Sequence, residues 1–174
     1  MPDPTDFTSI ALTDEQGNLL GFEGEEQNVG GCFDFSESNE NEGRSSSTTI
    51  EIVDPNYEIG YPYPSPFDLS FNIDITLPNA DIVSMFIFND IDEPIGLVID
   101  QASLDSGEHS FTWSGQELFT DTNLNGQYDD GELFIDSNSN GQWDDSVNDG
   151  YYRIIASFDS GYTCYRNIKK ETSS

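Results

Sequence analysis

The chain has 174 residues, of which 34% are hydrophobic and 13% are aromatic, and this aromatic content argues for a packed core and against a disordered acidic chain. Its formal net charge is −29, so its surface repels nucleic-acid phosphates and anionic lipid and attracts cations. A halophile-like solubility surface would account for this charge, but not for an ordered Asp–Asn–Gly repeat at residues 121–149.

The N-terminal region, residues 1–60, is predicted to be a β extension that ends in a polar linker. Residues 5–22 have the pattern of a hairpin, with apolar segments on both sides of a Gly-Asn turn. A short strand is expected around Cys32. The polar stretch 36–48 predicts a loop or linker, and the alternating residues 48–53 predict a further strand.

Residues 61–174 are predicted to form a β-sandwich. Prolines at alternate positions from 62 to 66 favour an extended entry segment. Between Leu69 and Leu77 apolar and polar residues alternate, which is typical of a strand with one buried face. Further strand-like segments follow at roughly 8–12 residue spacing, with turn signals between them. The predicted fold class is therefore all-β.

The two cysteines, Cys32 and Cys164, lack the spacing of a zinc site or of a CxxC redox motif. In an extracellular protein they would form one disulfide between the N-terminal region and the last strand, and the alternative is a pair of buried free thiols. No apolar run is long enough to span a bilayer. The first residues lack the basic and apolar segments of a signal peptide, so we expect either a mature form after export or a cytosolic protein.

Four short motifs follow one another along the second half of the chain. They are YPYP at Tyr61–Pro64, the Leu77-Pro78 turn, SGEHSFTW at 106–113 and GYYR at 150–153. In this order they resemble the bacterial FlgD-type immunoglobulin-like domain, whose relatives often end secreted proteins as C-terminal sorting domains. The resemblance implies an immunoglobulin-like sandwich at 61–174, in which residues 116–149 replace a short polar loop.

Residues 116–149, which replace that loop, contain one pattern twice. The pattern is D-x-N-x-N-G-x-aromatic-D-D, and it starts at Asp121 and again fifteen residues later at Asp136. Calcium loops of the D-x-[DN]-x-[DN]-G-x5-E type surround the ion with oxygens from positions 1, 3, 5, 7, 9 and 12. The glycine at position 6 permits the sharp turn. The predicted ligands of the first loop are Asp121, Asn123, Asn125, the Gln127 carbonyl, Asp129 and Glu132.

The second loop lacks the usual last ligand, because its position 12 is Val147. We expect the closing carboxylate to be Asp145 or Asp149. Both loops resemble those of dockerin and thrombospondin-type arrays, and together they predict about two Ca²⁺ ions of modest affinity. A metal-free polar turn region is the alternative. The other predicted ligands are Asp136, Asn138, Asn140, the Gln142 carbonyl and Asp144.

No catalytic set can be assembled around His109, the single histidine, which lies in the SGEHSFTW block. Paired acids such as Asp129-Asp130 would suit a glycosidase, but calcium ligation explains them better. We therefore predict a non-enzymatic, calcium-stabilised structural protein of the extracellular space or cell surface. It would self-associate into a fibre by strand exchange or calcium bridging, contact the cell surface or polysaccharide, and neither bind nucleic acid nor insert into a membrane. The alternative is a secretion-sorting or carbohydrate- or partner-binding accessory module.

Overall fold

The structure, a computed structural model, describes residues 5–34 and 56–173. Apart from the short 3-10 helix η1 (Glu26–Asn28), every regular element in these ranges is a strand, which confirms the all-β prediction. The predicted linker at 36–48 and strand at 48–53 lie outside the described residues. The strands are β1 (Ile10–Thr13), β2 (Leu19–Glu23), β3 (Gly30–Asp34), β4 (Glu58–Ile59), β5 (Phe71–Leu77), β6 (Asp81–Phe88), β7 (Pro94–Leu104), β8 (Gly107–Trp113), β9 (Gly150–Phe158) and β10 (Tyr162–Lys170).

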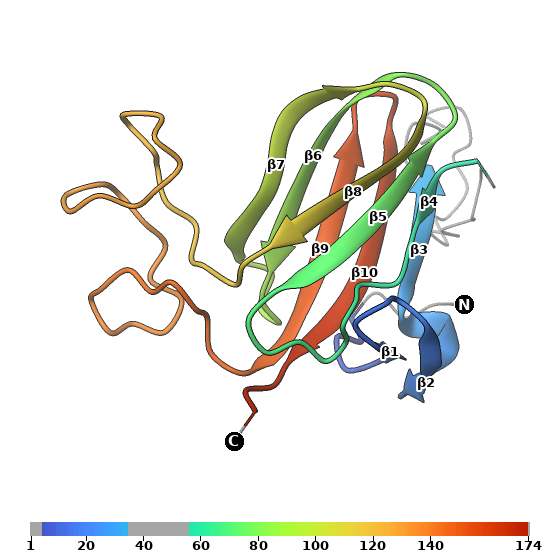
Figure 1. Cartoon of the computed structure of the whole chain (residues 1–174), viewed down its shortest axis with the longest axis horizontal. Coiled ribbons are helices and arrows are strands. Elements are labelled where there is room, and N and C mark those ends of the chain that lie inside the picture. The colour runs from blue at the N-terminus through green and yellow to red at the C-terminus, as the bar shows by residue number, and fades with distance from the viewer. Residues whose placement is uncertain (1–4, 35–55, 174) are drawn as a thin grey trace, which may run out of the picture.

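Two antiparallel sheets face each other (Figure 1). The larger has the order β3-β10-β9-β6-β7 and the smaller has the order β4-β5-β8. Burial alternates along β5 from Phe71 to Leu77, because successive side chains point to opposite faces of a strand. The inward side chains of β5 join those of β6, β9 and β10 in one hydrophobic cluster. This arrangement is consistent with a β-sandwich.

The N-terminal elements are attached to the last strand. The hairpin predicted for residues 5–22 is present as the β1–β2 pair. Strand β3 pairs antiparallel with β10, and the Cys32–Cys164 disulfide joins these two strands at paired positions. The predicted disulfide is therefore confirmed, and it fixes β3 at the edge of the larger sheet.

Polar side chains of the larger sheet hold the segment that precedes β1. Asn167 Nδ2 donates hydrogen bonds to the backbone oxygens of Asp6, Ser9 and Asn28, at 2.7, 3.0 and 3.1 Å. The guanidinium of Arg153 also donates to the Asp6 oxygen, at 3.0 Å. Both donors are buried, so their hydrogen bonds offset the cost of removing them from water.

The carboxylate of Asp6 organises the same segment and predicts a pH-dependent stability. It accepts hydrogen bonds from Ser9 Oγ at 2.5 Å, Asn28 Nδ2 at 2.9 Å and the Thr8 N–H at 2.8 Å, and these bonds lower the pKa of Asp6, that of Ser9 having the largest effect. A carboxylate with a lowered folded-state pKa stabilises the fold above its unfolded pKa of about 3.9, and this contribution is lost as the pH falls through the folded-state value.

We expect Asp6→Asn to lower the melting temperature near neutral pH, and the difference in melting temperature from wild type to narrow below about pH 4. Melting curves of both proteins across this pH range measure it, and a gap independent of pH would contradict the assignment.

Gly96 of β7 lies against the indole of Trp113 at the end of β8. A Cβ on Gly96 would stand 2.5 Å from Trp113 Cζ2, and the buried ring has little room to move. We expect Gly96→Ala to lower the free energy of unfolding by about 1–3 kcal/mol through overpacking, as measured by denaturant titration. Gly31→Ala is the matched control, because its methyl group would meet only the Phe33 ring at an ordinary 3.8 Å. Equal stability of Gly96→Ala and wild type would mean that the core accommodates the methyl group.

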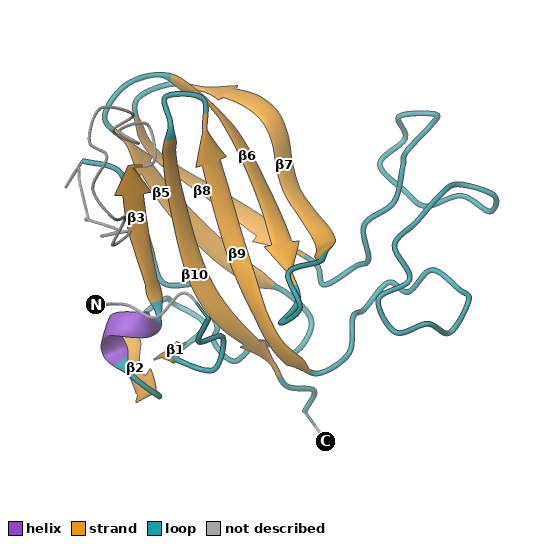
Figure 2. Ribbon diagram, turned by 180° about the vertical axis from the view of Figure 1, so that it is seen from behind, coloured by secondary structure: helices purple, strands orange, loops and turns teal. Residues whose placement is uncertain are grey.

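The segment between β8 and β9 projects away from the end of the sheets (Figure 1, gold to orange). Figure 2 shows it as loop throughout. It carries both copies of the repeated pattern. No helix in the described part of the chain is long and apolar enough to cross a membrane.

Candidate metal centre

The projecting segment is fixed to the sandwich near both of its ends. The Val147 N–H donates to the Gly115 oxygen at 2.7 Å, and the Leu118 N–H donates to the Ile95 oxygen of β7 at 2.8 Å. The Val147 side chain is buried within the core cluster. Position 12 of the second loop is therefore an anchor to the hydrophobic core, which explains why it is apolar.

The first loop wraps around its own side-chain oxygens. The Asp121 carboxylate accepts the backbone N–H groups of Asn125 at 3.2 Å and Gly126 at 2.7 Å. Asn123 Oδ1 accepts the Asn125 N–H at 3.0 Å, and Asn125 Oδ1 accepts the Gln127 N–H at 2.8 Å. Gly126 has a φ of 78°, a conformation that glycine adopts without steric cost. The predicted ligands at positions 1, 3 and 5 thus line the inside of one turn.

The second loop repeats each of these bonds. Asp136 accepts the N–H groups of Asn140 at 3.0 Å and Gly141 at 2.7 Å. Asn138 Oδ1 accepts the Asn140 N–H at 3.0 Å, and Asn140 Oδ1 accepts the Gln142 N–H at 2.7 Å. The φ of Gly141 is 80°. The two copies of the sequence pattern therefore adopt one local structure twice.

The carboxylate at position 9 lies where the side chains of each loop converge. Asp129 Oδ2 accepts hydrogen bonds from Asn123 Nδ2 at 2.6 Å and Asn125 Nδ2 at 2.7 Å, and these bonds lower the pKa of Asp129. Asp144 receives the equivalent amides of the second loop, at 2.6 and 2.8 Å. The amide N–H groups place positive partial charge beside a carboxylate, as a bound cation would. Over residues 5–34 and 56–173, no three His, Cys, Asp or Glu side chains converge as a metal-holding group, so a cation here would also need amide and carbonyl oxygens.

Glu132, at position 12 of the first loop, bonds to residues at positions 2 and 9 of that loop. Its Oε1 accepts the N–H of Thr122 at 2.7 Å and the Thr122 hydroxyl at 2.9 Å, while its Oε2 accepts the Asp129 N–H at 3.0 Å. These bonds, the one from Asp129 most of all, lower the pKa of Glu132 and keep it ionised. The carboxylate therefore spans the loop from position 2 to position 9.

Glu117 spans the second loop in the same way, although sequence analysis did not identify it. Its Oε1 accepts the N–H of Ser137 at 2.8 Å and the Ser137 hydroxyl at 2.6 Å, while its Oε2 accepts the Asp144 N–H at 2.9 Å. Ser137 and Asp144 are positions 2 and 9 of this loop. A signal for Glu117 exists in the sequence, because the triplet Glu-Leu-Phe occurs at 117–119 and again at 132–134, at the same fifteen-residue spacing.

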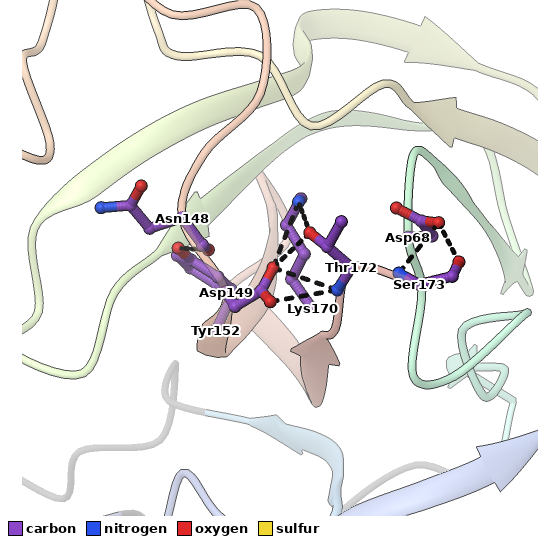
Figure 3. A network of polar contacts seen from close by, with 7 residues as sticks. All are labelled: Asp68, Asn148, Asp149, Tyr152, Lys170, Thr172 and Ser173. Atoms are coloured by element: carbon purple, nitrogen blue, oxygen red, sulfur yellow. Dashed lines mark hydrogen bonds and ion pairs between the residues drawn. The ribbon is translucent and has the colours of Figure 1, made fainter.

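Of the two residues predicted to close the second loop, Asp149 bonds to the C-terminal segment. Asp149 accepts hydrogen bonds from the Thr172 hydroxyl at 2.6 Å and the Thr172 N–H at 3.1 Å, and it lies 3.5 Å from Lys170 Nζ (Figure 3). These contacts, that of the Thr172 hydroxyl first, lower the pKa of Asp149. Beside it, Ser173 donates to Asp68, so this network fastens the C-terminal segment. Asp145 is exposed on the surface.

The aromatic residues at position 8 pack between the two loops. The rings of Tyr128 and Trp143 stack with centroids 4.8 Å apart, and the ring of Phe119 contacts both edge-on. The Trp143 Nε1–H donates to the Glu117 backbone oxygen at 2.9 Å. Tyr128, Trp143 and Phe119 thus form a small apolar core of the projecting segment, which holds the loops side by side.

Comparisons with protein-family models, with curated proteins and with solved structures gave no match. The resemblance to FlgD-type domains and to dockerin-like loops stays a prediction.

Proposed function

We propose that the protein is a non-enzymatic, calcium-binding structural module, an immunoglobulin-like β-sandwich whose double loop holds about two Ca²⁺ ions. One observation carries the proposal. The backbone N–H groups at positions 5, 6 and 7 bond to side chains at positions 1, 3 and 5 in both loops. A polar turn without a metal would not need the same residues and the same bonds twice.

The chemistry of the lining suits a hard cation. Ca²⁺ takes six to eight oxygen ligands in flexible geometry, and carboxylate, amide and carbonyl oxygens are the donors that both loops supply. An amide oxygen has two lone pairs, so Asn123 Oδ1 can keep its backbone N–H and still coordinate an ion. Asp129 Oδ2 would exchange its two amide N–H partners for the cation. Mg²⁺ fits less well because it requires near-ideal octahedral geometry.

An extracellular location is the second part of the proposal. The Cys32–Cys164 disulfide supports it, because such bonds persist in oxidising compartments. Calcium there also reaches the roughly millimolar concentrations that loops of modest affinity require. The single histidine, His109, lies 2.8 Å from the Asp105 carbonyl oxygen, a contact that suits a structural role in the β7–β8 turn.

Isothermal titration calorimetry with CaCl₂ tests the proposal. We expect about two ions per wild-type chain, about one in Asp121→Ala or Asp136→Ala, and none in the double variant, because each substitution removes position 1 of one loop. A wild-type chain that takes up no calcium at roughly millimolar concentration, or a double variant that still binds two ions, would refute it.

Self-association into a fibre is the finer part of the proposal. Strand β7 supports it, because β7 ends the order of the larger sheet, and an edge strand offers backbone groups to another chain. Light scattering with and without calcium measures the effect. A protein that stays monomeric at millimolar calcium would contradict calcium-bridged assembly.

A further inference from the structure

We propose that Glu117 is the closing calcium ligand of the second loop, so that each loop is closed by a glutamate from the other repeat. The inference rests on the proposed calcium binding and adds a residue that the linear twelve-residue pattern omits. The repeat unit is fifteen residues long, at 117–131 and again at 132–146. Each unit begins with its glutamate and continues into its loop.

The carboxylates of Glu132 and Glu117 are held by equivalent hydrogen bonds. Glu132 and Glu117 each receive a backbone N–H and a hydroxyl from position 2 on one oxygen, and the position 9 N–H on the other. All six distances lie between 2.6 and 3.0 Å. Glu132 stands at the position that donates a bidentate carboxylate in loops of this type. Glu117 therefore stands in the same relation to the second loop.

The carboxylate of Glu117 is buried and has no cationic partner among the described residues. Glu117 is 0% exposed, which is rare for a carboxylate unless it is paired or coordinates a metal. Within the ranges that the structure describes, the ion pairs involve Lys169 and Lys170, and none includes Glu117. Its three hydrogen bonds satisfy part of its oxygen capacity and leave its negative charge unbalanced. A calcium ion in the second loop would supply that missing charge.

A backbone pairing between the two repeat units sets both glutamates in place. Phe119 and Phe134 form an antiparallel bridge at the start of the two units. The Thr120 N–H donates to the Leu133 oxygen at 2.7 Å, and the Ile135 N–H donates to the Leu118 oxygen at 2.9 Å. Thr120 and Ile135 are equivalent positions of the two units, and so are Leu118 and Leu133. Each of the two bonds is therefore the counterpart of the other when the units are interchanged. The bridge is therefore locally two-fold, and it carries each glutamate to the loop of the opposite unit.

Calorimetric calcium titration of the variant Glu117→Gln tests this assignment, with Glu132→Gln as the matched variant. We expect each variant to weaken one of the two sites at least about tenfold, because even residues that only orient metal ligands contribute about 10–100-fold to affinity. Asp145→Asn and Asp149→Asn are expected to leave both sites unchanged. Two sites of wild-type affinity in Glu117→Gln would overturn the proposal, as would loss of the second site in Asp145→Asn or Asp149→Asn.

The test separates this inference from the proposed function and from misfolding. If the wild-type chain binds no calcium, the proposed calcium-binding function is refuted. If the wild-type chain and Glu117→Gln both bind two ions with equal affinity, only the proposed role of Glu117 is refuted. Circular dichroism without calcium checks that Glu117→Gln is folded. If it is not, Glu117→Asp keeps the charge with a shorter reach, and we expect two ions with one weakened site. Wild-type affinity at both sites of Glu117→Asp would then overturn the assignment.

Discussion

Replacement of both cysteines, in the variant Cys32→Ala/Cys164→Ala, is expected to lower the free energy of unfolding by about 2–5 kcal/mol. The bond joins positions separated by 132 residues, and the chain-entropy account assigns larger stabilisation to longer closed loops. In a chain of this length about 1 kcal/mol corresponds to about 2–4 °C, so the melting temperature should fall by about 4–20 °C.

The loss of stability in the cysteine variant should be greatest near the N-terminus. Among the strands that the structure describes, β3 has β10 as its single neighbour, and the disulfide ties these two strands. Without it, we expect faster amide hydrogen exchange in β3 than in β5 or β6, which lie within the core. Melting curves and hydrogen exchange of the variant and the wild type under non-reducing conditions measure both effects. Equal melting temperatures would mean that the paired strands hold without the covalent bond.

Local periodicity predicts the strands but not their partners. The alternation in Phe71–Leu77 identifies β5, because a strand with one buried face requires a period of two. The pairing of β3 with β10 joins segments at opposite ends of the chain. The buried donors Arg153 and Asn167 likewise bond to backbone oxygens of distant residues, Asp6 and Ser9, and no side-chain pattern encodes such partners. The sequence therefore predicts the fold class better than the sheet order.

The two loops show the same division between local and long-range structure. The first loop has all its predicted ligands within twelve residues, from Asp121 to Glu132, so a linear pattern describes it completely. Position 12 of the second loop is Val147, whose apolar side chain packs in the hydrophobic core. Its carboxylate, Glu117, precedes the loop and reaches it through the pairing of the two units. A pattern that runs only forward from Asp136 cannot find it, whereas the repeat of Glu-Leu-Phe can.

Calcium is expected to raise the melting temperature of the wild-type chain by about 10–20 °C, and removal of calcium with EDTA should reverse the rise. A ligand present at 100 times its dissociation constant stabilises the native state by about 2.7 kcal/mol per site, so two sites contribute about 5 kcal/mol. The chain gains this full stabilisation only if the loops and the sandwich unfold together. The burial of Val147 in the core and the Leu118–Ile95 hydrogen bond provide that link.

Non-specific screening is the competing effect, because a chain with a net charge of −29 gains stability from any cation. Two controls separate the effects. Magnesium at equal concentration screens the surface charge but fits the loops less well, and Asp121→Ala/Asp136→Ala keeps most of the charge while losing position 1 of both loops. We expect the specific rise to be absent in both controls. A rise of wild-type size in the double variant would show that calcium acts on the acidic surface as a whole, and the loops would then be structural turns.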